Sequence, residues 1–256
     1  MPAQTLRPDW PAPPGVVALM SLRGGGVSVA PWDSLNLRDG LGDDARAVAA
    51  NHAVLRTAVP ATPVFLDQVH GTRVVRLTDA DAGLGAAVHR ADASVTTEPG
   101  LACAIQVADC LPILFAAPHG QAVGAAHAGW RGLAGGVAKA TLLAVCEAAG
   151  CEPEEVHLWL GACIGPRRFE VGADVLAAFE STATRGAVDP RFVPQRAGKW
   201  LADLPGLAVD RLRAAGARHI TGGHWCTVGD ESRFFSFRRD GVTGRMAALV
   251  WIERRQ

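Results

Sequence analysis

The chain has 256 residues, 49% of them apolar, and its 25 lysines and arginines balance its 25 aspartates and glutamates. A chain of this length and composition is globular and buries a sizeable core. The balanced charge and the lack of a long basic run argue against a nucleic-acid-binding protein, because such proteins carry a basic surface. A small molecule is therefore the expected partner.

The sequence predicts neither a membrane segment nor a disulfide framework. Five prolines interrupt the N-terminal region, which therefore lacks the apolar core of a signal peptide, and no apolar run is long enough to span a bilayer. The six cysteines are scattered, without a CxxC pair, along a chain too large to need stapling. We expect a reduced, cytoplasmic protein that binds no membrane and is a monomer.

The first half of the chain predicts one helix among many strands. A proline-rich leader, residues 1–16, comes before an apolar strand that runs into a glycine-rich turn. Acidic residues followed by Val48, Leu55 and Val59 at helical spacing predict a helix over residues 43–59, with His52 at the edge of the core. Short apolar segments then predict strands at residues 64–71, 72–77, 92–97, 101–107, 112–117 and 122–130.

The second half alternates helices with strands. Residues 136–150 predict a helix ended by Gly150, and residues 203–216 predict one that starts at the N-cap Asp203 and stops at Gly216. A further helix is expected at residues 172–182, and strands are expected at residues 156–165, 233–241 and 245–254. No repeat or linker divides the chain. We therefore expect a single α/β domain over residues 1–256, with a mixed β-sheet and flanking helices.

Three polar side chains each follow an apolar strand and stand close to a glycine or proline. They are His70 in DQVHG, Cys110 in VADCLP and His127 in AAHAGWRG. Two imidazoles and a thiolate suit zinc or copper, and three protein ligands leave a fourth position open, as in catalytic sites. The same residues also suit a cysteine nucleophile with a histidine base oriented by Asp109. The spacing alone leaves both interpretations open.

Longer motifs resemble a known family. DQVHG, ADCLPI, AAHAGWRG, LGACIGPRRFEVG, the pair Cys226 and Thr227, and FFSFRRDGVTGRMA are similar, in order and spacing, to the bacterial YfiH family. This family is also called the laccase-domain, polyphenol-oxidase-like or peptidoglycan-editing-factor family. The resemblance covers nearly the whole chain. One departure is SLNLRDGLGDD in place of the usual SLNLGxHVGDD, so this loop is expected to differ in its substrate contacts.

The resemblance implies an α/β fold and one zinc or copper ion held by His70, Cys110 and His127. It also implies phosphorolysis of adenosine, inosine, guanosine and methylthioadenosine, and deamination of adenosine. Asp109 is expected either to shuttle a proton or to stabilise the strand turn. Three alternatives stay open: a Cys-His hydrolase that edits peptidoglycan precursors, a copper-dependent phenol oxidase, and a metal-binding protein without catalysis. Eight histidines without an HxH pair argue against the multicopper oxidase.

Phosphorolysis needs a site for phosphate beside the nucleoside, and arginines next to glycine-rich turns suit it. The arginines expected to bind phosphate or substrate are Arg23, Arg131 and Arg239. Arg238 and Arg245 are expected to be solvated surface residues. Cys163, at a strand end before a glycine-proline pair, is expected to line the pocket, and Trp130 is expected in the core or stacked on a purine.

Overall fold

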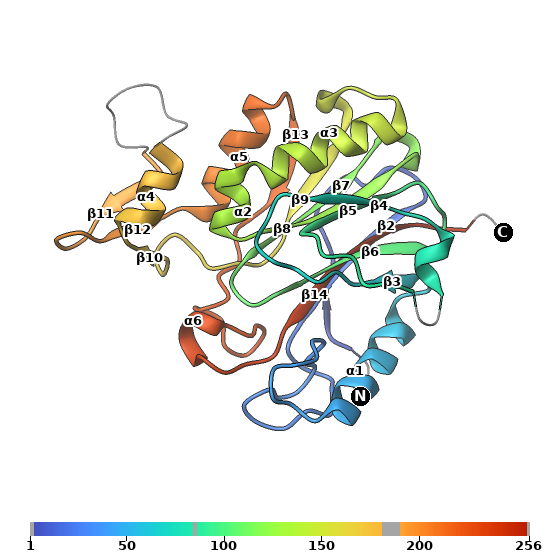
Figure 1. The fold of residues 1–256 in the computed structure, drawn as a ribbon, viewed down its shortest axis with the longest axis horizontal. Helices are drawn as coiled ribbons and strands as arrows, with labels where there is room; N and C mark the ends of the chain where they lie inside the picture. Colours follow the sequence, from blue (N-terminus) through green and yellow to red (C-terminus); the bar gives the residue numbers. More distant parts are fainter. Residues whose placement is uncertain (1–2, 84–85, 181–189, 255–256) are drawn as a thin grey trace.

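The computed structural model describes residues 3–83, 86–180 and 190–254. Two large sheets pack face to face in it (Figure 1). The five-stranded sheet has the order β1 (Thr5–Leu6), β2 (Val16–Ser21), β14 (Met246–Ile252), β6 (Leu101–Val107) and β3 (Thr62–Val64). The six-stranded sheet has the order β13 (His219–Gly222), β9 (His157–Leu160), β7 (Leu111–Ala116), β8 (Val123–Ala128), β5 (Ala93–Thr96) and β4 (Val74–Leu77). A small sheet has the order β10 (Glu170–Val171), β12 (Trp200–Ala202) and β11 (Phe192–Pro194).

Helices cover the outer faces of both large sheets. The helices are α1 (Ala45–Ala58), α2 (Trp130–Gly135), α3 (Val137–Ala149), α4 (Ala173–Glu180), α5 (Leu204–Ala214) and α6 (Phe237–Asp240). Helices α2, α3 and α5 lie over the six-stranded sheet, and α1 packs on the far side of the five-stranded sheet (Figure 1). Parallel pairs such as β9–β13 occur beside antiparallel pairs such as β7–β8. The predicted α/β class with a mixed sheet is thus confirmed.

The central strands are apolar on both faces because both faces are buried. In β7, Ile113 and Phe115 belong to the core under α3 and α5, whereas Leu114 belongs to the core between the two sheets. In β6, Ile105 lies in that same core between the sheets, and Ala104 lies in the core beside α1. This burial explains the continuous apolar runs that the sequence shows at these strands.

Local capping signals in the sequence correspond to the observed helix ends. Asp44 caps α1 by accepting a hydrogen bond from Arg46 N–H, and Asp203 caps α5 by accepting one from Gly206 N–H. Gly150 ends α3 in the left-handed conformation with a φ of 66°, which glycine adopts without steric cost. These three helices start and end within two residues of their predicted limits.

A short turn connects the two large sheets. Strand β6 ends at Val107 in the five-stranded sheet, and β7 begins at Leu111 in the six-stranded sheet. The turn formed by residues 108–110 therefore crosses from one sheet to the other. Asp109 adopts a φ of 87°, which is uncommon for a residue other than glycine. Cys110 is the last residue of this turn and stands directly before β7.

The strand predicted at residues 233–241 is wrong. The segment contains the short helix α6, which Ser236 caps by accepting a hydrogen bond from Arg239 N–H. Asp109, distant in sequence, accepts a second hydrogen bond from Arg238 N–H at 2.6 Å. Two acceptors at the N-terminus of α6 thus stabilise a helix where the aromatic residues alone suggest a strand.

The strand predicted at residues 64–71 is also largely wrong, because β3 ends at Val64. Beyond it, the side chain of Gln68 pairs with the backbone of Gln106 in β6. Its Nε2 donates to Gln106 O, and its Oε1 accepts from Gln106 N–H, both at 2.8 Å. The side-chain amide of Gln68 thus makes the hydrogen bonds to β6 that a backbone strand would make. The following residues, up to His70, form a loop.

Some regions were not anticipated or lie outside the described residues. The sequence did not predict β1, β10–β13 or α2, whose short, weakly patterned segments give little local signal. Thr5 and Leu6, inside the predicted leader, pair with β2. Met1, Pro2 and the last two residues of the helix predicted at 172–182 lie outside the described residues. Among the described residues, no helix is long and apolar enough to span a bilayer.

Candidate metal centre

The structure brings together the three residues that the motifs singled out. The ligand atoms of His70, Cys110 and His127 all lie within 4.8 Å of one another. Cys110 Sγ lies 3.7 Å from His70 Nε2, and the two imidazole rings meet edge to face, with centroids 4.8 Å apart. His127 is buried, Cys110 is partly buried, and His70 is exposed. The cluster is thus anchored in the core and open to solvent on one side.

Strand pairing places two of the three donors. His127, near the end of β8, stands opposite Pro112 in β7, two residues after Cys110. The backbone beyond β8 then passes close to the cluster at Gly129. A β-carbon at Gly129 would lie 2.9 Å from both Cys110 Sγ and His70 Cδ2. Only a residue without a side chain fits this position, so Gly129 allows the three donors to converge.

Asp92, which the sequence reasoning missed, orients the imidazole of His127 and holds the backbone at His70. This carboxylate is fully buried and accepts a hydrogen bond from His127 Nδ1 at 2.8 Å. It also accepts backbone hydrogen bonds from His70 and Gly71, at 2.8 and 2.7 Å, and from Val69 at 3.1 Å. A proton on His127 Nδ1 leaves Nε2 free as a metal ligand, the arrangement common around bound metals. The sequence signal was an aspartate at the start of a fully buried strand.

The charges in the cluster favour a thiolate. Burial alone would raise the pKa of Cys110, but the charge of His127 and hydrogen bonds from both histidines outweigh it and lower the pKa to about 6. For His127, burial lowers the pKa, but Cys110 and Asp92 outweigh burial and raise it to about 9. The thiolate is the form of cysteine that binds metals, and the lowered pKa makes Cys110 a thiolate near neutral pH. Two imidazoles and one thiolate therefore fit zinc or copper as a donor set.

Asp109 stabilises the turn that carries Cys110. Its Oδ1 accepts a hydrogen bond from Thr227 Oγ1 at 2.5 Å, and its Oδ2 accepts the α6 backbone hydrogen bond from Arg238. Its backbone carbonyl accepts a hydrogen bond from Ile164 N–H at 2.9 Å. Three segments distant in sequence are thus tied to the turn by Asp109.

Two of the arginines expected to bind phosphate are engaged by the chain itself. Arg23 donates to the backbone carbonyls of Asp33 and Glu231 and pairs with the Asp33 carboxylate at 3.1 Å. Arg239 donates to several backbone carbonyls, including that of Thr227 at 2.8 Å, and pairs with the neighbouring carboxylate of Asp240. These guanidinium groups connect loops within the fold.

The remaining arginines differ in their exposure. Arg131, four residues after His127, is exposed, and its guanidinium carbon lies 4.1 Å from the centroid of the Trp130 ring. Arg238 is exposed, as expected. The expectation that Arg245 is a solvated surface residue is wrong, because it is partly buried and donates to the carbonyls of residues 243 and 244 at 2.9 and 3.1 Å.

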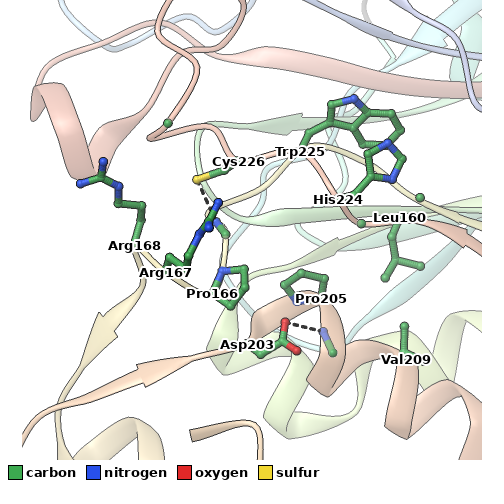
Figure 2. Close-up of a pocket in the computed structure, with 15 residues that line it drawn as sticks. Leu160, Pro166, Arg167, Arg168, Asp203, Pro205, Val209, His224, Trp225 and Cys226 are labelled. Carbon is green, nitrogen blue, oxygen red and sulfur yellow. Dashed lines mark hydrogen bonds between the residues drawn. The ribbon is translucent and has the colours of Figure 1, made fainter. Parts of the chain in front are cut away.

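Cys163 lies beneath the surface, not on it. Its side chain is fully buried, and its backbone forms a β-bridge with Cys226. Cys226, in turn, lines a cavity of about 840 Å³ together with Arg167, Trp225 and the start of α5 (Figure 2). No residue of the His-Cys-His cluster lines this cavity. The cavity and the cluster are thus separate features at the same end of the six-stranded sheet.

Comparisons with known proteins show the family of this chain. A family model described as multi-copper polyphenol oxidoreductase laccase matches residues 17–253, and the chain therefore belongs to this laccase-like family. A purine nucleoside phosphorylase of Pseudomonas aeruginosa is 48% identical over 97% of this chain and 98% of its own length. The purine nucleoside phosphorylase YfiH of Escherichia coli (strain K12) is 45% identical over 96% of this chain and 97% of its own length.

Solved structures show the same architecture. A Neisseria meningitidis protein of the DUF152 family has a TM-score of 0.89 at 44% identity, with 98% of this chain and 99% of that chain covered. YlmD from Geobacillus stearothermophilus has a TM-score of 0.91 at 34% identity, with 98% and 96% covered. The resemblance to the YfiH family is thus confirmed along nearly the whole chain.

Proposed function

We propose that this protein is a metal-dependent purine nucleoside phosphorylase that acts in the cytoplasm as a single-domain monomer. Phosphate replaces the purine at C1′ of the nucleoside: the bond from C1′ to the base nitrogen breaks, a bond from C1′ to a phosphate oxygen forms, and the base leaves with a proton. The observation that carries the proposal is the convergence of His70, Cys110 and His127 in a chain whose relatives bear this name.

A zinc or copper ion at the cluster would act as a Lewis acid toward an oxygen of a bound reactant. The residues of the chain prepare that site. Asp92 keeps the proton on His127 Nδ1 and orients the imidazole. The exposed side of the cluster, at His70, admits the nucleoside, whereas buried His127 closes the opposite side. We propose that Arg131 contacts the reactants from the start of α2.

The finer substrate range is part of the same proposal. Adenosine, inosine, guanosine and methylthioadenosine share a purine and a ribose carbon at which phosphate attacks. Deamination of adenosine to inosine is proposed as a second reaction of the site, with Asp109 beside Cys110 as the group that moves a proton. Its hydrogen bonds to Thr227 and to the Arg238 amide hold the carboxylate at a defined position.

A second candidate function is a Cys-His hydrolase that acts on an amide, such as one in a peptidoglycan precursor. The short distance of 3.7 Å between Cys110 Sγ and His70 Nε2, and the lowered pKa of Cys110, favour it. A tightly bound metal blocks a thiolate nucleophile, whereas the phosphorylase requires the metal. Copper-dependent phenol oxidation is disfavoured, because the described residues show one group of three close His, Cys or acidic ligands and not a multicopper cluster.

The decisive experiment incubates metal-loaded protein with adenosine or inosine, with and without phosphate, and separates the products by chromatography. We expect the free base and ribose 1-phosphate only when phosphate is present, with some inosine formed from adenosine. Chelation should abolish both reactions, and added zinc or copper should restore them. Base release without phosphate would indicate a hydrolase instead. Amide hydrolysis that rises on chelation, with nucleosides untouched, would support the cysteine mechanism.

A further inference from the structure

Arg38 and Arg245 form a pair of partly buried cations beside the cluster. Among the described residues, neither guanidinium has a carboxylate within ion-pair distance, in contrast to Arg23, Arg191 and Arg239. Partly burying an arginine without a counter-ion is costly, and natural proteins usually pair such charges. The missing counter-ion therefore points to an anionic ligand.

One buried asparagine positions the backbone of both arginines. Asn36 is fully buried, and its Oδ1 accepts hydrogen bonds from Arg38 N–H at 3.1 Å and from Arg245 N–H at 3.0 Å. Leu37 N–H donates to the carbonyl of Arg245 at 3.1 Å. The loop that carries Arg38 is thus bound to the residue that precedes β14.

The pairing of β14 with β6 places Arg245 near the turn that carries Cys110. Met246, the first residue of β14, pairs with Val107, the last residue of β6, and the turn that ends at Cys110 follows. Electrostatic effects agree with this position. Burial and the charge of Arg38 lower the pKa of Arg245, whereas the nearby charges of Cys110 and Asp109 act in the opposite direction.

A cavity next to Arg245 offers space and another donor. It measures about 290 Å³ and is lined by Arg245, Thr243, Phe237 and the loop at residues 40–41. Thr243 is only 2% exposed, and its hydroxyl has no hydrogen-bond partner among the described residues. A buried hydroxyl without a partner is rare in native proteins, and Thr243 is a lining residue of this cavity, so the missing partner is a second sign of a ligand.

We propose that Arg38, Arg245 and the Thr243 hydroxyl bind the phosphate that enters the reaction. This inference rests on the proposed function, because it assigns a place to the co-substrate of that reaction. Two guanidinium forks match the oxygens of a phosphate dianion, and the hydroxyl donates to a third. Arg245 directly precedes Met246, which pairs with Val107, so the site lies near the turn that ends at Cys110.

The first test measures phosphate binding without turnover. Metal-loaded protein is titrated with inorganic phosphate by calorimetry, for the wild type and for Arg38→Gln, Arg245→Gln and Thr243→Val. Each arginine variant should bind phosphate roughly 10- to 100-fold more weakly, and Thr243→Val several-fold more weakly. Arg218→Gln, which breaks an exposed ion pair with Glu154, controls for the lost charge and should bind like the wild type. Unchanged phosphate binding in both arginine variants would overturn the inference.

The second test measures turnover. It distinguishes this phosphate site from other anion sites, and it distinguishes a failure of this inference from a failure of the proposed function. In turnover, Arg38→Gln should raise the KM for phosphate about 10- to 100-fold and leave the KM for the nucleoside and the metal content unchanged. A loss of phosphate binding confined to Arg131→Gln would overturn the assignment, as would binding of adenosine monophosphate without binding of inorganic phosphate. If the wild type cleaves no nucleoside, the proposed function fails, whereas the calorimetric result still decides the phosphate site. Metal content and circular dichroism verify folding, and Arg245→Lys replaces Arg245→Gln if the latter does not fold.

Discussion

Two cysteines at the same end of the six-stranded sheet have thiol pKa values that are shifted in opposite directions. Cys110 stands directly before β7 and Cys163 follows β9, the antiparallel neighbour of β7. Burial raises the pKa of Cys163 well above its usual value, and the neighbouring Cys226 and Asp109 raise it further. Burial acts in the same direction on Cys110, yet His127 and His70 lower its pKa to about 6.

Because burial raises the pKa of both thiols, it does not decide which of them is deprotonated near neutral pH. The imidazoles decide it, because a positive charge and hydrogen bonds stabilise a thiolate that burial alone would protonate. The region around Cys110 has two histidines and a buried carboxylate that orients one of them. The region around Cys163 offers a second thiol and acidic neighbours. We therefore expect metal binding and thiolate chemistry in the first region and structural packing in the second.

The largest expected effect separates the two cysteines by metal binding. Cys110→Ala should lose stoichiometric zinc or copper, with affinity reduced by more than about 100-fold, because even residues that only orient ligands contribute 10- to 100-fold. Cys163→Ala should keep the metal, since its thiol lies outside the donor group. Metal analysis after chelation and reconstitution measures both. Retention of the metal by Cys110→Ala would contradict the comparison.

The second effect concerns thiol reactivity in metal-free protein as a function of pH. Because the pKa of Cys110 is lowered to about 6, its thiolate persists at neutral pH, and its alkylation rate should fall only as the pH drops through about 6. Cys163 should stay unmodified in folded protein, because its pKa is raised and it is fully buried. Mass spectrometry after iodoacetamide treatment locates the label. Rapid labelling of Cys163, or a midpoint for Cys110 near 9, would break the comparison.

The third effect tests the carboxylate behind the cluster. Asp92→Asn removes the charge that orients His127, so metal affinity should fall roughly 10- to 100-fold. Asp81→Asn is the matched control, since Asp81 also pairs with a histidine, His89, but away from the cluster. Competition with a chromophoric chelator measures the affinity. Equal affinities in the two variants would show that Asp92 serves only the fold.

The smallest expected effect concerns the contact between the two regions. Thr227 follows Cys226 and donates to Asp109, which precedes Cys110. Thr227→Val removes this hydrogen bond to a carboxylate and should lower the free energy of unfolding by about 1.5 kcal/mol. Metal stoichiometry should not change, because no ligand is altered. Denaturant unfolding measures the stability; loss of the metal in this variant would mean that the contact also holds the cluster together.

Much of the fold could be predicted because the relevant patterns are local. Apolar runs marked β6, β7 and β8, and caps and glycine stops marked α1, α3 and α5. The three donors could also be named, since each stands within two residues of a glycine or proline in a motif that resembles the YfiH family. The role of Asp92 was missed, although it stands at the start of a buried strand, because that role depends on the proximity of β5 to the loop at His70, 22 residues earlier in the chain.

The sequence by itself determined the α/β class, the strands that cross the core and the three residues that meet at the cluster, because periodicity, caps and motifs act over a few residues. Only the tertiary structure decided that residues 237–240 form a helix, that Arg23 and Arg239 are engaged within the fold, and that Arg38 and Arg245 are held by the same asparagine. Each of these outcomes depends on a partner distant in sequence, such as Asp109 for α6 and Asn36 for Arg245. Contacts of this kind exist only once the two sheets have packed together.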